Sequence, residues 1–150
     1  MNATLYFGYG ANISRDHMAR ACPGSRCQGR AMLPGMRLII NEDGWATVVP
    51  SAGEAVHGAL WMLTAACEAA LDAQEDVDGG LYSKERMVVL DACGQPRDVT
   101  VYVATRSGTG MPNPGYLERI VTWAECWGFP EPYRDRLSGL RAPRGEGCPK

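Results

Sequence analysis

The sequence predicts an α+β fold, organised as one domain around a curled or closed sheet. Three observations lead to this class. With 150 residues and 45% hydrophobic content, the chain is long enough for one core and too short for two. Several short β-rich runs are separated by turn residues, which favours antiparallel pairing. Helical segments interrupt these runs without the regular strand-helix alternation of a doubly wound parallel sheet.

The beginning of the chain predicts a strand, a tight turn and a helix. Residues 4–8 are β-rich, and Gly8 and Gly10 allow the backbone to turn sharply after them. Apolar residues then recur at helical spacing over about residues 13–20. We therefore expect a glycine-rich exit from the first strand into the first helix.

The middle of the chain predicts short strands joined by tight turns. The β-rich runs cover residues 36–41, 45–50 and 56–63. The turn pairs that separate them are Pro34-Gly35, Asp43-Gly44 and Ala52-Gly53. Thr64 is then a suitable N-cap for an alanine-rich helix over residues 65–74, which Gly79-Gly80 prevents from continuing.

The last third predicts a β-hairpin and a helix. Residues 81–90 and 99–104 are β-rich and flank a turn at residues 93–96. Asn113-Pro114 supplies an N-cap and a first-turn proline for a helix that Gly128 closes. We assign residues 1–141 to the domain and residues 142–150, by their composition, to a flexible tail.

Composition argues against several classes of protein. The formal charge of −2 gives no long-range attraction for nucleic acid or anionic lipid. No apolar run reaches the roughly 20 residues of a membrane helix, and the first residues lack the pattern of a signal peptide, so we expect a cytoplasmic protein. The cysteines are scattered and only two histidines accompany them, which argues against a metal site. Cys67 and Cys126 are expected to be buried thiols in helices.

The turn Tyr9-Gly10-Ala11-Asn12 is the first candidate site. A glycine-rich exit from a strand into a helix leaves backbone N–H groups pointing one way, with the helix dipole behind them. Such a turn suits an anion or an oxyanion. Taken alone, the same pattern is more often a simple tight turn.

Glu75 is the second candidate, at the C-terminal end of the predicted helix over residues 65–74. The helix dipole opposes negative charge there, and partial burial would add a desolvation cost, so both effects raise a carboxyl pKa. A raised pKa suits a group that takes and returns a proton near neutrality. The alternative is a solvated acidic loop over residues 75–78. Tyr82 and Tyr116 are further candidates for hydrogen bonds to a substrate, although tyrosines at such boundaries are usually half-buried with the hydroxyl in water.

Four separated stretches, in order, carry a common signature. They are Tyr6-Phe7-Gly8-Tyr9-Gly10-Ala11-Asn12; residues 46–50 with 56–61; Leu71-Asp72-Ala73-Gln74-Glu75 with Gly80-Leu81-Tyr82; and residues 113–117 with 127–133. In residue identity and order they resemble the motifs of the γ-glutamylcyclotransferase-like (AIG2-like) family. Members of that family begin with Y-F-A-Y-G-S-N and carry a catalytic glutamate in L-D-x-x-E-G-x-x-x-G-x-Y. The resemblance runs almost end to end.

The resemblance implies a mixed β-barrel with surrounding helices, a substrate pocket at the barrel mouth and frequent homodimers. It maps the catalytic glutamate onto Glu75. The residues that it maps onto substrate binding are Tyr9, Gly10, Ala11, Asn12, Tyr82 and Tyr116. The implied reaction cyclises a small γ-glutamyl substrate to 5-oxoproline and releases an amine, without a metal or other cofactor.

Two departures from the family pattern bear on the substrate. Ala11 replaces a serine, which removes a hydroxyl, and Asp76 replaces the glycine after the glutamate, which adds a charge and restricts the backbone. The leaving amine stays open between an amino acid and the amine of a γ-glutamylamine or γ-glutamylamide. Residues 37–44 and 106–112 are candidates for the side of the pocket that receives it. A non-catalytic binding protein on the same fold is the alternative from another class.

Overall fold

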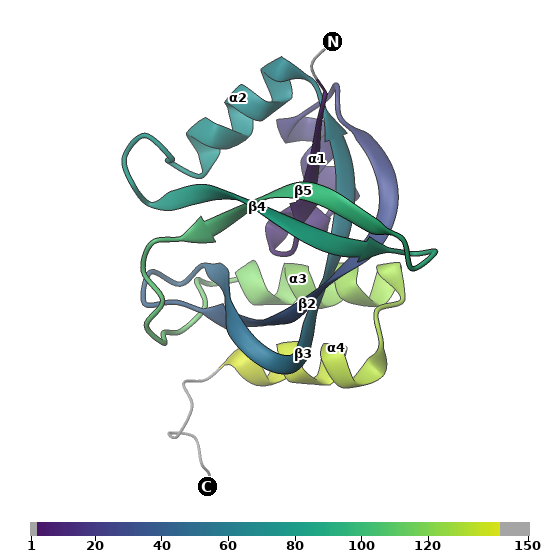
Figure 1. Cartoon of the computed structure of the whole chain (residues 1–150). Coiled ribbons are helices and arrows are strands. Elements are labelled where there is room, and N and C mark those ends of the chain that lie inside the picture. Colours follow the sequence, from purple (N-terminus) through teal and green to yellow (C-terminus); the bar gives the residue numbers. More distant parts are fainter. Residues whose placement is uncertain (1–2, 142–150) are drawn as a thin grey trace, which may run out of the picture.

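A closed, five-stranded barrel forms the centre of the structure, a computed structural model that describes residues 3–141 (Figure 1). The strands follow one another around the barrel in the order β1-β3-β2-β4-β5. The barrel closes where β1 runs parallel to β5, and the other neighbouring pairs are antiparallel. The strands are β1 (Thr4–Gly8), β2 (Arg26–Ile40), β3 (Ala46–Leu63), β4 (Tyr82–Asp91) and β5 (Pro96–Ala104). The predicted α+β class and closed sheet are confirmed.

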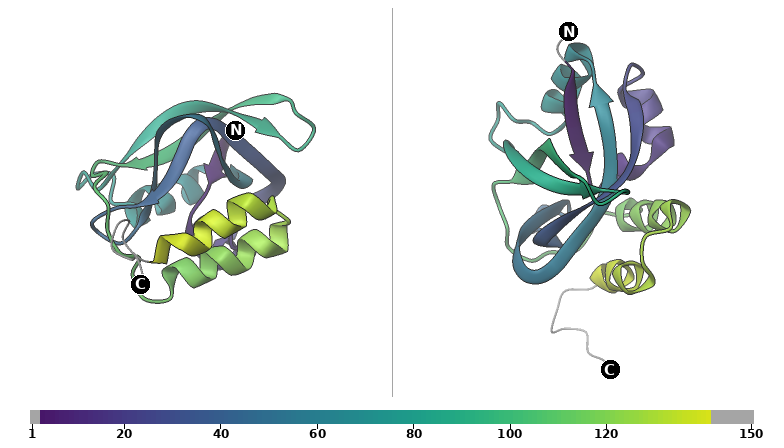
Figure 2. Two further views of the ribbon diagram at one scale, coloured as in Figure 1. Left: turned by 90° about the horizontal axis from the view of Figure 1, so that it is seen from below. Right: turned by 45° about the vertical axis from the view of Figure 1, so that its right-hand side comes forward.

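Helices cover two parts of the barrel. Figure 2 shows α3 and α4 side by side against one flank, whereas α1 and α2 lie toward the end of the barrel where β1 begins. The α-helices are α1 (Arg15–Ala21), α2 (Ala65–Gln74), α3 (Tyr116–Trp127) and α4 (Glu131–Ser138); the 3-10 helices are η1 (Ala11–Ile13) and η2 (Gly139–Arg141). None of the helices in residues 3–141 is long and apolar enough to cross a membrane. The predicted tail, residues 142–150, lies outside the described residues.

The predicted strand residues in the middle of the chain are extended and the Asp43-Gly44 turn is confirmed, but the other two predicted turns do not end a strand. Two long strands, β2 and β3, form one hairpin that turns only at Asp43-Gly44. Pro34-Gly35 lies within β2, and Ala52-Gly53 lies within β3. The register jumps there, because Pro34 pairs with Ala55 whereas Met36 pairs with Pro50. These glycine-containing pairs therefore form a bulge, which lets a long hairpin bend around a barrel without ending its strands.

The starts of the predicted helices are confirmed in one case and corrected in two. Thr64 caps α2, with its Oγ1 accepting from the N–H of Cys67 at 3.1 Å. Helix α1 starts two residues later than predicted, because η1 precedes it and Ser14 provides the cap. Helix α3 starts at Tyr116 after Gly115, whose φ of 78° is left-handed, so Asn113 is not the N-cap.

The elements after α2 agree with the prediction from the sequence, but the exposure of one cysteine does not. The hairpin of β4 and β5 is present, and Gly128, with φ 73°, ends α3 as predicted. The side chain of Asp91 accepts from two N–H groups within the hairpin turn, at 2.9 Å each, which fixes that turn. Cys67 is buried as expected, but Cys126 is exposed because it lies on the outer face of α3. Helix α4, which was not predicted, follows Pro130.

Candidate active site

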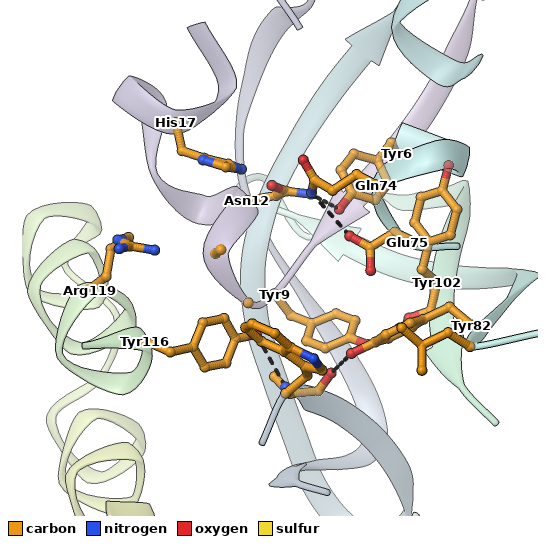
Figure 3. Close-up of a pocket in the computed structure, with 15 residues that line it drawn as sticks. Tyr6, Tyr9, Asn12, His17, Gln74, Glu75, Tyr82, Tyr102, Tyr116 and Arg119 are labelled. Carbon is orange, nitrogen blue, oxygen red and sulfur yellow. Dashed lines mark hydrogen bonds between the residues drawn. The ribbon is translucent and has the colours of Figure 1, made fainter. Parts of the chain in front are cut away.

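A cavity of about 440 Å³ brings together the residues selected from the sequence (Figure 3). Its walls come from the turn after β1, the end of α2 and the starts of β3, β4 and α3. The selected residues that line it are Tyr9, Gly10, Ala11, Asn12, Glu75, Tyr82 and Tyr116. Side chains that were not selected also line it, among them Tyr6, His17, Trp45, Gln74, Tyr102 and Arg119.

The turn after β1 presents its N–H groups and uses its carbonyls internally. The carbonyl of Gly10 accepts from Ile13 at 3.1 Å, and that of Ala11 accepts from Ser14 at 3.0 Å. Within residues 3–141, the N–H groups of residues 10–12 have no hydrogen-bonded backbone carbonyl. A Cβ at position 10 would lie 2.8 Å from the hydroxyl of Tyr116, so a glycine is required for the phenol to approach. The turn therefore presents N–H donors next to the Tyr116 hydroxyl, with which the backbone of Ala11 also interacts.

Glu75 ends α2, where its N–H donates to the carbonyl of Leu71 at 2.8 Å. Its half-buried carboxylate has one hydrogen-bond partner in the described chain, the neighbouring amide of Gln74 at 3.2 Å. Burial raises the pKa of Glu75 and the Gln74 amide partly offsets this, with no contribution from a cation of the described residues. The expected direction of the pKa shift is confirmed. A carboxylate of this kind can take a proton and release it again near neutral pH.

Asp76, which follows Glu75, has an unusual backbone conformation. Its φ of 52° makes it the one non-glycine residue in the described range with a left-handed backbone. This explains why a glycine would be favoured at this position, since Asp tolerates the conformation at some cost. Its carboxylate lies against Gly79 and is not among the causes of the pKa shift of Glu75. The expected electrostatic effect of Asp76 on Glu75 is therefore absent from that shift.

Tyr82 and Tyr116 are both held by the backbone of Ala46, but in opposite senses. The hydroxyl of Tyr82 donates to the carbonyl of Ala46 at 2.7 Å, which commits its proton. The hydroxyl of Tyr116 instead accepts from the N–H of Ala46 at 3.2 Å, so its own proton stays available to a ligand. Both side chains are buried, at 6% and 8% exposure, which corrects the expectation of hydroxyls in water. Burial raises the pKa of Tyr116 to about 12, so the phenol keeps this proton.

The other phenols of the cavity divide in the same way. Tyr6 accepts from the side-chain amide of Asn12 at 2.7 Å and keeps its proton available. Tyr9 donates to the carbonyl of Tyr102 at 2.6 Å, and Tyr102 donates to the carboxylate of Asp72 at 2.6 Å. Tyr9 and Tyr102 therefore hold the wall of the cavity, whereas Tyr6 and Tyr116 are the phenols that can donate to a ligand.

Two buried polar atoms of the described residues have no hydrogen-bond partner, Oδ1 of Asn12 and Nε2 of His17. Both residues line the cavity. Unsatisfied buried polar atoms are rare in native proteins and need an explanation such as a ligand or ordered water. Their presence in one cavity indicates that this is a binding site.

Some of these additional residues had a detectable signal in the sequence. Arg119 lies three residues after Tyr116 on α3, and residues at this spacing share a helix face. Tyr6 precedes the turn residue Gly8 by two positions on β1, which places both on one side of the strand. His17 and Tyr102 had no such signal, because only the packing of α1 and β5 brings them to the cavity.

Neither segment that was expected to receive the leaving amine lines this cavity. Residues 37–44 and 106–112 instead meet around a second hollow of about 330 Å³. Arg106 joins the two segments by ion pairs to Glu42 and Asp43, at 3.4 and 3.0 Å. These contacts join the two segments away from the cavity that holds Glu75, and which side receives the leaving amine stays a prediction. Within residues 3–141, no cluster of metal-ligating side chains occurs.

A family model and similar proteins of known name point to the same family. The model of the AIG2-like family matches residues 55–137, more than half of the chain. Proteins named γ-glutamylcyclotransferase from Mus musculus and Homo sapiens are each 26% identical over 146 residues, covering 91% of this chain and 78% of theirs. Glu75, Tyr82 and Tyr116 lie inside the matched span, whereas the turn over residues 9–12 precedes it.

Solved structures support the same fold. A structure described as a γ-glutamyl cyclotransferase is 25% identical, with a TM-score of 0.86 over 98% of this chain and 93% of that one. YkqA from Bacillus subtilis is 19% identical, with a TM-score of 0.80 over 95% of this chain and 56% of its own. At this identity, the similarity to YkqA supports the fold alone.

Proposed function

Since this chain belongs to the AIG2-like family, we propose that it cyclises γ-glutamyl compounds to 5-oxoproline, with Glu75 as the proton shuttle. One observation carries the proposal. A half-buried carboxylate with a raised pKa, Glu75, shares a cavity with the free N–H groups of the turn over residues 10–12. The γ-glutamylcyclotransferase names of the relatives support the same reaction.

The reaction is an intramolecular acyl transfer. The α-amine nitrogen of the γ-glutamyl group attacks its own γ-carbonyl carbon, a C–N bond closes the five-membered lactam, and the C–N bond to the leaving amine breaks. Holding the folded conformer supplies much of the rate, because well-oriented intramolecular reactions gain up to about 7–11 kcal/mol. Only protons are exchanged with the protein, so the proposed reaction needs neither a metal nor another cofactor.

Proton transfer is the task assigned to Glu75. The α-amine is protonated at neutral pH and cannot attack until a base removes a proton. Glu75, ionised, takes that proton and then returns it to the nitrogen that leaves, while the ring nitrogen gives its second excess proton to water as the lactam forms. Burial raises the pKa of Glu75 because it disfavours the charged carboxylate. Near neutral pH, uptake and release of the proton are therefore closer in free energy.

Binding of the γ-glutamyl end is assigned to the turn and its neighbours. The free N–H groups of residues 10–12 suit the α-carboxylate or the developing oxyanion. The available proton of Tyr116 adds a further donor beside that turn. The unpartnered Oδ1 of Asn12 is an acceptor suited to the α-ammonium group.

The test is a panel of γ-glutamyl amino acids, γ-glutamylamines and γ-glutamylamides, with 5-oxoproline measured by mass spectrometry. We expect 5-oxoproline and the free amine in equal amounts from at least one class of substrate. A folded protein that releases no 5-oxoproline from any of them would refute the proposal, and tight binding without turnover would favour the non-catalytic alternative. A homodimer and a cytoplasmic location stay predictions from the sequence.

A further inference from the structure

Two basic side chains face the cavity from the side opposite Tyr82 and Tyr102. Figure 3 shows His17 from α1 and Arg119 from α3 on one side, with Glu75 on the other. Arg119 follows Tyr116 by one helical turn, which accounts for its position at the cavity. The proposed reaction gives neither basic residue a role.

The guanidinium of Arg119 and one ring nitrogen of His17 have no partner in the described residues, although the imidazole also interacts with the side-chain amide of Gln74. The guanidinium of Arg119 makes no ion pair or side-chain hydrogen bond within residues 3–141, although other arginines such as Arg97 and Arg106 are paired. Nε2 of His17 is buried and has no hydrogen-bond partner. An unpaired cation beside an unsatisfied imidazole nitrogen offers donors to a planar anion.

The charges around these groups separate the cavity into two parts. Burial lowers the pKa of His17, and the cations of Arg20 on α1 and Arg119 on α3 lower it further, while the amide of Gln74 on α2 acts in the opposite direction. Arg119 is not among the causes of the pKa shift of Glu75. The pKa of Tyr116 responds to both, since Glu75 raises it and Arg119 lowers it. The phenol therefore lies between an acidic and a basic part of the cavity.

We propose that Arg119 and His17 form a subsite that binds a carboxylate carried by the leaving amine, and that they select leaving groups by charge. The proposal rests on the proposed function, in which the γ-glutamyl end occupies the turn amides and Glu75. Arg119 is exposed, so it lies where the cavity opens to solvent and where the released amine departs. A carboxylate there gains two sets of donors, whereas an ammonium group at the same distance is repelled.

The experiment compares three substrates that differ only at the end of the leaving group: γ-glutamylalanine, its neutral C-terminal amide, and a γ-glutamyl diamine with a terminal ammonium group. We expect the protein to prefer the carboxylate over the amide by at least about tenfold in kcat/KM, as for a charge-assisted hydrogen bond. Arg119→Gln should reduce this ratio to about threefold or less. His17→Gln should reduce it partly.

Matched controls separate a subsite from a general effect of charge. Arg86→Gln removes an equal charge from an exposed position on β4 outside the cavity, and should leave the ratio as it was. Arg119→Lys keeps the charge without the fork of donors and should restore part of the preference. An unselective protein, or an unchanged ratio in Arg119→Gln, would overturn the proposal.

Failure of the subsite is distinguishable from failure of the reaction. If no substrate releases 5-oxoproline, binding of γ-glutamylalanine and its amide to Glu75→Gln still tests the preference for a carboxylate. A third comparison replaces the α-carboxylate of the γ-glutamyl end by an amide. If Arg119→Gln abolishes discrimination at that end instead, Arg119 binds the other carboxylate of the substrate and the assignment is wrong.

Discussion

Helix α2 carries two paired carboxylates that contact the barrel strands, and an unpaired carboxylate follows at its end. Glu68 accepts from Thr4 at 2.7 Å and from Lys84 at 2.5 Å. Asp72, one turn later, accepts from Tyr102 at 2.6 Å and pairs with the same lysine at 3.3 Å. These contacts hold the helix to β1, β4 and β5.

The last carboxylate, Glu75, lies three residues further on and meets only the amide of Gln74 within the described chain. The pKa values reflect this difference, because Lys84 and Thr4 lower that of Glu68 whereas burial raises that of Glu75. Glutamates of one short helix thus acquire opposite properties from their surroundings. The contacts of Glu68 and Asp72 with the strands fix the helix, and the fixed helix presents an unpaired carboxylate to the cavity.

The largest expected effect comes from Glu75→Gln. We expect kcat for 5-oxoproline release to fall by about a thousandfold or more, since a general acid-base group supplies about 10²–10⁴ and this one serves two transfers. The free energy of unfolding should stay the same or rise, because a poorly paired charge is removed. Steady-state kinetics and denaturant unfolding measure the two quantities.

The paired position of the same helix provides the control. Asp72→Asn should keep most of the turnover and lower the free energy of unfolding by about 1 kcal/mol, because it weakens the contacts to Tyr102 and Lys84. A Gln variant at position 75 that retains normal turnover would contradict the distinction between the two carboxylates.

Tyr116 and Tyr82 extend the comparison to hydroxyls. Tyr116→Phe removes a proton that is free for a ligand, so kcat/KM should fall about tenfold. Tyr82→Phe removes a proton already donated to Ala46, so the main effect should be a loss of about 1–2 kcal/mol in the free energy of unfolding. Kinetics and thermal unfolding of both variants test this division. If the two variants lost equal amounts of kcat/KM and equal amounts of unfolding free energy, this division between the two hydroxyls would be wrong.

The pH dependence of stability should differ in sign between Glu75 and Glu68. The folded chain retains the Glu75 proton to a higher pH, so from about pH 4.3, the unfolded glutamate pKa, up to the raised folded pKa, stability falls as the pH rises. The lowered pKa of Glu68 gives stabilisation that is present above about pH 4.3 and is lost as the pH falls. Unfolding of Glu75→Gln and Glu68→Gln across pH 3–8 isolates each contribution; slopes of one sign would contradict the assignment.

The smallest expected effect concerns the loop that follows Glu75. Asp76→Gly should raise the free energy of unfolding by about 0.5 kcal/mol, because relief of the left-handed strain slightly exceeds the entropy of an added glycine. Asp78→Gly, where φ is not left-handed, should lower it by a similar amount. Thermal unfolding distinguishes the two signs. Destabilisation by both changes would show that the contact of Asp76 with Gly79 outweighs the strain.

The sequence predicted the local elements better than the long strands. Thr64 and Gly128 act through their own turn, and their helix boundaries were correct. Pro34-Gly35 has the same composition as a tight turn, yet it lies in a bulge because β3 continues to pair on both sides of it. Helix α4 was missed, since eight residues after a proline have little intrinsic signal. A pairing partner far along the chain is not visible in a local pattern.

From the sequence alone came the turn over residues 9–12 and the carboxylate at the end of α2, because glycine spacing and helix capping are local properties; the family resemblance added that the two share a pocket. The tertiary structure decided which polar atoms remain open there. Whether a tyrosine proton is free depends on the carbonyl that happens to face it, as the opposite contacts of Tyr82 and Tyr116 with Ala46 show. Hydrogen-bond partners distant in sequence are set by packing, and packing decided that Arg119 and His17 meet in the same cavity as Glu75.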